Sequence, residues 1–282
     1  MLKLAVAIAD STALPSAFVV LRGLEHAIRK AQRLGFDGVE LALKRADQVK
    51  RETLETLLSE TGLEISCIST GQVYADLGFS FTDSDSERRT ILRDIFKSLI
   101  DLAADFGKMV NIGRVRGQIG AVPRVEAEQR FFAMARELGD YAAKKQVILL
   151  LEPVNRYELD FINTVAEGVE LLKKLDLPNM KLMPDVFHMN IEDVSIGGEL
   201  AQHIEYIGYI HLADSNRLAP GQGHTDFREI LESLKHAAYD GWLSVEILPK
   251  PDPDTAAHQA IEYLRPLIDA YSTIGTVTNR VF

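Results

Sequence analysis

Four apolar segments in the second half of the 282-residue chain each carry a side chain that can bind a metal ion. These segments read VILLLEP, MKLMPD, YIHLAD and LSVEILP, and the side chains are Glu152, Asp185, His211 and Glu246. Burying a carboxylate without a partner is costly, so four such positions in succession indicate a shared ligand. Three carboxylates and one imidazole suit a divalent ion such as Mn²⁺, Mg²⁺ or Co²⁺ better than a soft metal.

Loop residues near these segments could contact a substrate. Glu158 follows the first segment, and Arg217 follows the third. Arg114 and Arg116 close an earlier apolar run, where a guanidinium could bind a carboxylate or a phosphate through two hydrogen bonds. A solvated loop is an equally good interpretation of this arginine pair.

The elements that must position these residues are eight short apolar runs. Most are apolar throughout, which is typical of strands with both faces buried in a parallel sheet. The predicted strands are Leu2–Ala9, Gly38–Leu43, Glu64–Thr70, Met109–Val115, Val147–Val154, Met180–Asp185, Tyr206–Leu212 and Gly241–Leu248. The carboxyl ends of parallel barrel strands meet at one rim, so we expect the four metal-capable side chains to converge there.

Amphipathic segments separate these runs and predict helices, for example over residues 24–34, 90–106, 166–175 and 227–238. Eight strands, each followed by a helix or helical turn, predict an α/β fold, a (β/α)8 TIM barrel that spans residues 1–282 as one domain. The alternative is an open doubly wound sheet with a small second domain, but neither a nucleotide fingerprint nor a linker-like break occurs. The connections 71–86 and 116–123 are candidate lids, and residues 279–282 are predicted to form a tail or a subunit contact.

Composition narrows the class of partner. The chain has 31 Lys and Arg against 41 Asp and Glu, a formal net charge of −10, which disfavours binding to nucleic acid. Its single cysteine, Cys67, excludes an intrachain disulfide and a cysteine-rich metal site, and the apolar neighbours of Cys67 indicate a core position. No stretch approaches the roughly 20 apolar residues of a membrane helix, and we expect a cytoplasmic protein.

Longer motifs around these residues resemble a known family. The segments LEPVNRYELDFINT, PDVFHMNIED, HLADSNRLAPGQGH and LSVEILP resemble the sugar isomerase/epimerase superfamily, the barrels similar to xylose isomerase. The likeness covers nearly the whole chain and is greatest to the ketose 3-epimerases of the tagatose/psicose type. Within that group, STGQVYADLGFSFT and NIGRVRGQ resemble bacterial epimerases that act on 5-keto-L-gluconate.

The resemblance implies one divalent metal ion, usually Mn²⁺, held by Glu152, Asp185, His211 and Glu246. Inverting the carbon next to a ketone requires one proton to leave from one face and another to arrive on the opposite face. Glu152 and Glu246 belong to strands separated by two others, so they could flank a substrate and alternate as general base and general acid. We therefore expect a metal-dependent C3 epimerase, and the relatives suggest a homo-oligomer, a dimer or a tetramer.

The resemblance also implies that Glu158, His188 and Arg217 contact the oxygens around C1–C3 of a ketose. The substrate-binding residues that we expect are Glu158, His188, Arg217, Gln72, Arg114 and Arg116. Aromatic residues that some ketose epimerases place beside the first and fourth strands are not evident here, where Ala7 and the arginine pair stand instead. This departure favours a keto-sugar acid such as 5-keto-L-gluconate or D-tagaturonate over a neutral hexulose.

Four alternatives use a similar barrel. An aldose–ketose isomerase or an inosose dehydratase would employ the same metal and bases. A barrel nuclease that cleaves DNA at abasic sites needs further histidines where this chain has Leu43 and Thr70, and the acidic net charge also disfavours it. A non-catalytic sugar-binding barrel would have no use for the complete set of metal-capable residues.

Overall fold

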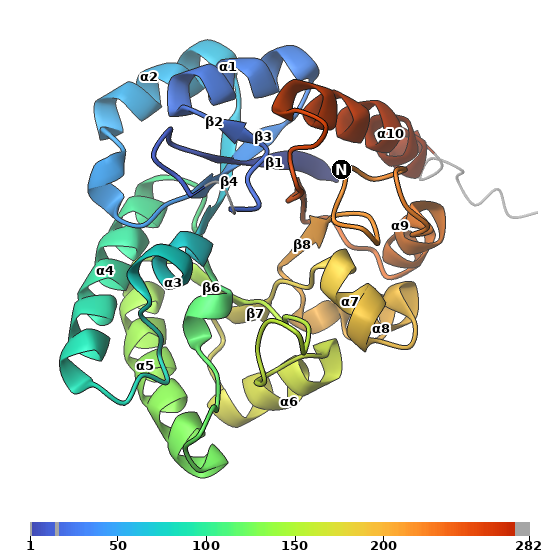
Figure 1. Ribbon diagram of the computed structural model, residues 1–282. Coiled ribbons are helices and arrows are strands. Elements are labelled where there is room, and N and C mark those ends of the chain that lie inside the picture. The colour runs from blue at the N-terminus through green and yellow to red at the C-terminus, as the bar shows by residue number, and fades with distance from the viewer. Residues whose placement is uncertain (1, 15–16, 274–282) are drawn as a thin grey trace, which may run out of the picture.

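The computed structural model describes residues 2–14 and 17–273, which form a barrel of parallel strands enclosed by helices (Figure 1). Neighbouring strands follow the order β7-β6-β5-β4-β3-β1-β9-β8, and every pairing is parallel. The barrel strands are β1 (Lys3–Ala9), β3 (Gly38–Ala42), β4 (Glu64–Ser69), β5 (Met109–Ile112), β6 (Ile148–Leu151), β7 (Met180–Leu182), β8 (Tyr209–Leu212) and β9 (Trp242–Val245). The predicted (β/α)8 barrel is confirmed.

The barrel closes at a sparse seam between β7 and β8. Isolated bridges, not a continuous ladder, join these two strands, and one of them pairs Asp185 with His211. The backbone amide of His211 donates to the carbonyl of Pro184 at 2.9 Å, and the amide of Gly208 donates to the carbonyl of Leu182 at 2.9 Å. The two ends of the sheet therefore meet through a few hydrogen bonds.

Ten α-helices of the described part of the chain cover the outside of the barrel or line its rim (Figure 1). Their starts follow local capping chemistry: the Asp85 carboxylate accepts from the first-turn amides of α4, and Thr164 and Glu167 form a capping box at α6. The helices are α1 (Leu24–Leu34), α2 (Arg51–Thr61), α3 (Gly71–Leu77), α4 (Ser86–Asp105), α5 (Arg124–Lys144), α6 (Val165–Leu175), α7 (Val186–Glu192), α8 (Ile196–Gln202), α9 (Phe227–His236) and α10 (Pro253–Thr273).

Three elements differ from the sequence-based expectation. A two-residue strand, β2 (Leu21–Arg22), pairs with β1, and the candidate lid 71–86 contains helix α3. The expected strand 109–115 ends at Ile112, because the Asn111 side chain accepts from the amide of Gly113 at 2.8 Å and the chain turns into a short 3-10 helix over Arg114–Arg116. Residues 279–282 lie outside the described part of the chain.

The layer between strands and helices is apolar, whereas the barrel interior also holds polar side chains such as Glu40 and Ser66. One large cluster of buried residues joins every barrel strand to the surrounding helices, and Cys67 is buried in a second, smaller cluster, as predicted. In the described residues, no helix is both long enough and apolar enough to cross a membrane.

Candidate active site

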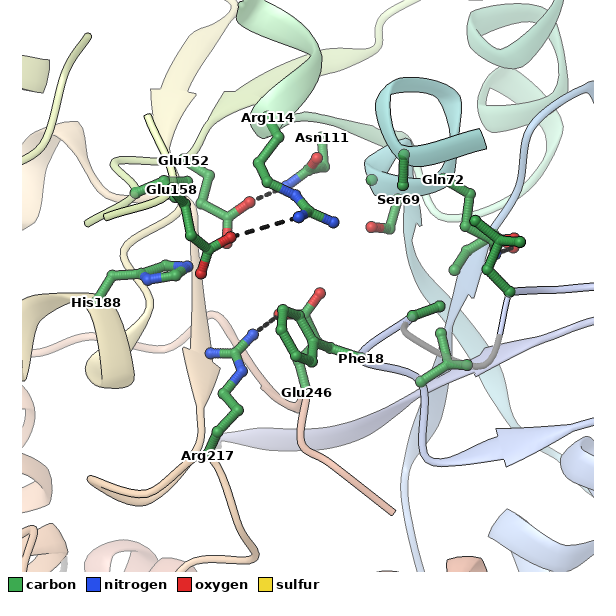
Figure 2. Close-up of a pocket in the computed structure, with 17 residues that line it drawn as sticks. Phe18, Ser69, Gln72, Asn111, Arg114, Glu152, Glu158, His188, Arg217 and Glu246 are labelled. Atoms are coloured by element: carbon green, nitrogen blue, oxygen red, sulfur yellow. Dashed lines mark hydrogen bonds and ion pairs between the residues drawn. The ribbon is translucent and has the colours of Figure 1, made fainter. Parts of the chain in front are cut away.

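A cavity lies at the carboxyl ends of the barrel strands and encloses about 600 Å³, including the solvent at its mouth (Figure 2). The side facing β1, β3 and β4 is lined mainly by apolar and uncharged side chains, whereas the ends of β6 and β9 bring carboxylates. The polar lining residues are Ser69, Gln72, Asn111, Arg114, Glu152, Glu158, His188, Arg217 and Glu246. Five of the six expected substrate contacts thus line one cavity.

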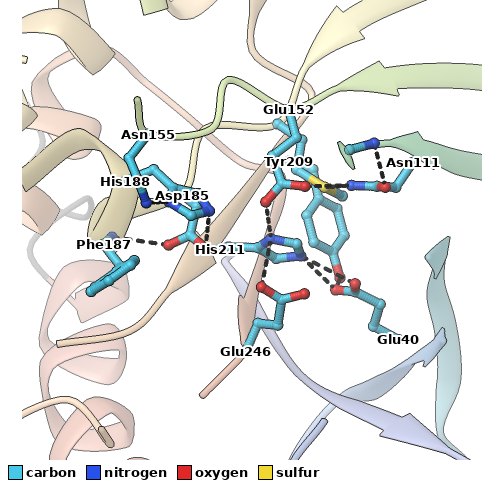
Figure 3. A network of polar contacts seen from close by, with 12 residues as sticks. Glu40, Asn111, Glu152, Asn155, Asp185, Phe187, His188, Tyr209, His211 and Glu246 are labelled. Atoms are coloured by element: carbon cyan, nitrogen blue, oxygen red, sulfur yellow. Dashed lines mark hydrogen bonds and ion pairs between the residues drawn. The ribbon is translucent and has the colours of Figure 1, made fainter. Parts of the chain in front are cut away.

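The four metal-capable side chains predicted from the sequence meet in one cluster (Figure 3), and two of them, Glu152 and Glu246, line the cavity. Glu152 directly follows β6, Asp185 begins α7 after β7, His211 lies in β8 and Glu246 directly follows β9. One ligand atom from each residue lies within 4.8 Å of the ligand atoms of the other three. The strand ends therefore converge as the barrel architecture requires.

His211 is the centre of this cluster and is fully buried. Its Nδ1 lies 3.3 Å from Glu152 Oε1 and 3.7 Å from Glu246 Oε2, while its Nε2 lies 3.0 and 3.1 Å from the two carboxylate oxygens of Glu40. Burial alone would lower the pKa of His211, but the surrounding carboxylates, Glu40 first, raise that pKa well above its usual value. The imidazole thus lies in a strongly negative environment.

Arg217 ties two members of the cluster together. Its guanidinium donates to the carboxylates of Asp185 and Glu246, and it lies between two aromatic rings, 4.6 Å from the centroid of Phe18 and 5.0 Å from that of Phe187. Burial would raise the pKa of Asp185, yet the charge of Arg217 keeps it below its usual value. A planar guanidinium held by two carboxylates and two rings has little freedom, so it fixes both carboxylates.

The pKa values of the two glutamates are shifted in opposite directions. Burial opposes the charge of Glu152, but its hydrogen bond with His211 and the charges of His211 and His188 lower the pKa of Glu152 to about 2. Burial and the negative charges of Glu152 and Asp185 outweigh the attraction of His211 and Arg217 and raise the pKa of Glu246 to about 8. Pairs of carboxyl groups with separated pKa values are typical of acid–base sites.

The donor set fits a divalent cation. Four carboxylates, from Glu40, Glu152, Asp185 and Glu246, lie around His211, and Arg217 supplies one opposing charge. Oxygen and imidazole donors at these separations suit Mn²⁺, Mg²⁺ or Co²⁺, and a divalent ion would compensate the excess negative charge. The cluster is a possible metal site of four residues.

His188 faces the cavity beside this cluster. Its Nδ1 lies 2.7 Å from the side-chain amide nitrogen of Asn155, and its Nε2 lies 3.9 Å from Asp185. Burial lowers the pKa of His188, which favours the neutral ring. Because the Asn155 amide donates to Nδ1, the ring proton resides on Nε2.

The arginine pair of the sequence separates into two environments. Arg114 lines the cavity, 3.5 Å from Glu158 and with its guanidinium carbon 6.0 Å from the Phe18 ring centroid. Arg116 is 0% exposed and does not line the cavity. Its guanidinium donates to the backbone carbonyls of Gly113, Glu152, Phe161 and Ile162 at 2.6 to 3.2 Å.

The position of Arg116 therefore differs from that of a substrate-contact residue. All three of its guanidinium nitrogens are engaged by carbonyls of two loops, so no donor is directed into the cavity. Burial lowers the pKa of Arg116 to about 10. Its role in the structure is to satisfy loop carbonyls that would otherwise be buried without a donor.

Gln72, near the start of α3, is another expected substrate contact that lines the cavity. Its Nε2 donates to the carbonyl of Ala42 at 2.9 Å, which fixes the orientation of the amide. Its Oε1 is buried and has no hydrogen-bond partner among the described residues. An unpaired buried acceptor in a cavity wall can receive a hydroxyl donor from a ligand.

Sequence reasoning missed three residues of the site. Phe18 covers Arg217, Asn111 donates to Glu152 at 3.2 Å, and Glu40 contacts His211. A single signal was available for Glu40, a lone charge inside the apolar strand segment GVELAL. Phe18 and Asn111 have no comparable signal, because a loop phenylalanine and a strand asparagine are common in unrelated settings.

Comparisons with known proteins agree with this geometry. Residues 28–267 match the xylose isomerase-like TIM barrel family. The chain is 31% identical over 231 residues to an L-ribulose 3-epimerase from Methylomonas sp. (strain DH-1), covering 79% of this chain and 78% of that enzyme. It is 28% identical over 246 residues to a 3-dehydro-D-guloside 4-epimerase from Escherichia coli (strain K12), covering 84% and 92% respectively.

A solved structure of a sugar epimerase is also similar to this chain. A D-allulose 3-epimerase from Methylomonas sp. matches with a TM-score of 0.76 and 25% identity, covering 94% of this chain and 98% of that chain. The barrel, its rim cluster and these matches define an enzyme of the isomerase class. The chain belongs to the xylose isomerase-like TIM barrel family. The predicted likeness to ketose 3-epimerases is confirmed, and the finer likeness to 5-keto-L-gluconate epimerases stays a prediction.

Proposed function

We propose that the protein is a metal-dependent epimerase that inverts C3 of a ketose or a keto-sugar acid, with 5-keto-L-gluconate and D-tagaturonate as the preferred candidates. The observation that carries this proposal is the convergence of Glu152 and Glu246 on one cavity, each beside His211 and within 4.8 Å of the other ligand atoms. The relatives named as 3-epimerases support the same reaction.

Glu152 and Glu246 act as the two bases. One carboxylate removes the C3 proton, which is acidified by the adjacent ketone, and leaves an enediolate. The other, in its protonated form, returns a proton to C3 from the opposite face, so the substrate regains one proton with inverted configuration.

The metal would be held by Glu152, Asp185, His211 and Glu246, and we propose Mn²⁺ with Mg²⁺ or Co²⁺ as alternatives. A bound divalent ion supplies Lewis acidity that stabilises negative charge on the substrate oxygens. Asp185 is kept ionised by Arg217, which prepares it as a ligand. We also propose a cytoplasmic homo-oligomer that acts on small molecules.

Substrate orientation falls to side chains around the cluster. His188 presents Nε2–H to a substrate oxygen, since Asn155 occupies its other nitrogen. Glu158 can accept from a substrate hydroxyl. The Nε of Arg217 is buried without a partner among the described residues, and we assign it to a further substrate oxygen.

The outer part of the cavity favours a keto-sugar acid. The Arg114 side chain has no hydrogen bond among the described residues, and its one ion pair there, with Glu158, is 3.5 Å long. Its guanidinium can therefore turn toward a carboxylate and bind it with two hydrogen bonds. Gln72 Oε1 offers an acceptor for a hydroxyl group on the same ligand.

The test is proton NMR in D₂O with metal-stripped protein reconstituted with Mg²⁺, which avoids paramagnetic broadening. The panel comprises 5-keto-L-gluconate, tagaturonate, fructuronate, tagatose, psicose and fructose. We expect deuterium only at C3, together with formation of the C3 epimer. Deuterium at C1 with an aldose product would make the protein an aldose–ketose isomerase, and loss of water would make it a dehydratase. A protein with bound metal and no exchange in any sugar would refute the epimerase proposal.

A further inference from the structure

Glu40 holds a carboxylate inside the barrel, below the cavity and outside its lining. It is the third of five residues of β3, where it is 0% exposed and pairs in register with Cys67 of β4. An ionised carboxylate at such a position is strongly unfavourable unless donors compensate it.

Two donors from β8 compensate Glu40 (Figure 3). His211 Nε2 lies 3.0 and 3.1 Å from its two oxygens, and the Tyr209 hydroxyl donates to it at 3.0 Å. Tyr209 has one hydroxyl proton, which is directed to Glu40, so the Ser66 hydroxyl 2.6 Å away must donate to Tyr209. A directed chain of hydrogen bonds, Ser66 to Tyr209 to Glu40, thus orients the carboxylate from behind.

This chain determines which nitrogen of His211 faces the cluster. A carboxylate can only accept, so Nε2 of His211 must carry the proton that it donates to Glu40. Nδ1 faces Glu152 and Glu246 at 3.3 and 3.7 Å; without a metal ion it donates to Glu152, and a divalent ion would take the place of that proton. We propose that Glu40 is a positioning residue, which holds His211 in the tautomer and ring orientation that direct the Nδ1 lone pair to a metal ion. Carboxylates that accept from a metal-binding histidine commonly raise its basicity and fix its rotation.

The inference rests on the proposed metal site, but it has its own readout. We would label the protein with ¹⁵N-histidine and follow the His211 Nε2–H proton and both ring nitrogens, first without metal and then with Mg²⁺. A hydrogen bond to a buried carboxylate predicts a downfield, slowly exchanging Nε2–H in both states. A wild-type protein that shows this proton and binds no Mg²⁺ would refute the metal site while retaining the Glu40–His211 contact.

The decisive variant is Glu40→Gln, which keeps the shape and removes the charge. We expect its Nε2–H resonance to move upfield or vanish, and Mg²⁺ and Mn²⁺ affinity, measured by calorimetry, to fall by roughly 10- to 100-fold. Glu40→Asp should restore part of both signals. Cys67→Ala is the matched control, since Cys67 lies opposite Glu40 in the ladder and lacks a hydrogen bond to His211 in the described structure. It should lose stability and leave the His211 resonances unchanged.

The proposal is overturned if folded Glu40→Gln keeps the wild-type His211 shifts and binds Mg²⁺ within twofold of wild type. If Glu40→Gln does not fold, Tyr209→Phe provides the test, because it removes one donor to Glu40 and keeps the ring packing. The Nε2–H proton should then persist but exchange several-fold faster with water, and metal affinity should fall. Unchanged exchange and affinity in Tyr209→Phe would overturn the proposal in that case.

Discussion

The two halves of the barrel rim have different compositions. The ends of β6 to β9 contribute ionisable side chains that touch one another, namely Glu152, Asp185, His211 and Glu246. The ends of β3, β4 and β5 contribute Ala42, Ser69 and Asn111 to the same cavity. One half of the rim concentrates carboxylates, which suits proton transfer under the proposed function. The other half presents neutral groups together with Arg114, which suits recognition of the substrate. Changes in the first half should alter kcat, and changes in the second should alter KM.

Two arginines that follow β5, two positions apart, also lie in different environments. Arg114 faces the cavity with free donors, whereas Arg116 is enclosed by loop carbonyls. Under the proposed function Arg114 contacts the substrate, whereas Arg116 holds loop carbonyls of the framework. Variants of both residues therefore separate binding effects from stability effects.

The largest effect is expected from Glu246→Gln in the ionisable half of the rim. Removing one of two acid–base groups should lower kcat by roughly 10²- to 10⁴-fold, with much less change in KM. Turnover would be followed by deuterium incorporation at C3, and retained metal would be verified by elemental analysis. Gln72→Leu is the matched change in the other half, and it should mainly raise KM. Normal turnover in metal-bound Glu246→Gln would refute the two-base scheme.

The second effect concerns stability and distinguishes the two arginines. Arg116→Met leaves the buried carbonyls of Glu152 and Phe161 without a donor, so the free energy of unfolding should fall by about 3 to 5 kcal/mol. The carbonyls of Gly113 and Ile162 keep backbone amide donors from Arg116 and Val154. Urea unfolding followed by circular dichroism measures this change. Arg114→Met is the control and should stay within about 0.5 kcal/mol of wild type. Equal losses in both variants would remove the distinction between framework and recognition.

The third effect sharpens the substrate preference. Arg114→Met should raise KM for 5-keto-L-gluconate or tagaturonate by roughly 10- to 100-fold, because a charged hydrogen-bond partner of the substrate is lost. KM for tagatose and psicose should change by less than about threefold, since neutral sugars do not need the charge. Steady-state kinetics with both substrate types test this. A uniform change across acids and neutral sugars would contradict the keto-acid proposal.

The smallest effect lies outside both halves of the rim, at Asp193 after α7. Burial and the charges of Glu199 and Glu192 raise its pKa to about 7, although it accepts from the backbone amide of Val165 at 3.3 Å. The unfolded carboxyl titrates near pH 4, so the folded state binds more protons between about pH 4 and 7 and loses stability as the pH rises.

Asp193→Asn keeps the acceptor and removes the charge. It should raise the free energy of unfolding at pH 8 by about 1 to 3 kcal/mol and change it little at pH 4. Thermal unfolding at the two pH values, with Glu170→Gln at an exposed site as control, measures this difference. A gain of the same size at both pH values would show that titration of Asp193 is not the cause.

Much of the architecture and the cluster could be predicted from sequence, for a physical reason. Parallel barrel strands are apolar throughout, so a carboxylate or imidazole where such a run ends is conspicuous, as at Glu152 and Asp185. Other features depend on contacts between distant segments. Arg116 was predicted to contact the substrate, with a solvated loop as the alternative, because the carbonyls of Phe161 and Ile162 that bind it lie 45 and 46 positions away. The contact of Glu40 with His211 could not be predicted, because the sequence does not say that β8 faces the Glu40 side chain across the barrel.

Helix propensity and hydrophobic periodicity did not predict two short elements, α3 and β2. The seven residues of α3 include Gly71 and Val73, which have weak helix propensity, and the segment is helical because it packs under the rim and ends at the left-handed Gly78. The strand β2 comprises two residues, too few for any periodic pattern. Both elements result from tertiary contacts, which override local preference.

The sparse seam between β7 and β8 gives the cluster a second consequence. Asp185 and His211 form one of the two bridges that join the ends of the sheet, so a divalent ion held by both side chains would also stabilise the closed barrel. Opening of this seam and release of the ligand then become one equilibrium, and each is suppressed by the other. The amides of Gly208 and His211, which span the seam, should exchange with solvent more slowly as the divalent ion concentration rises. The proposed active site would thus also stabilise the junction at which isolated bridges join the two ends of the sheet.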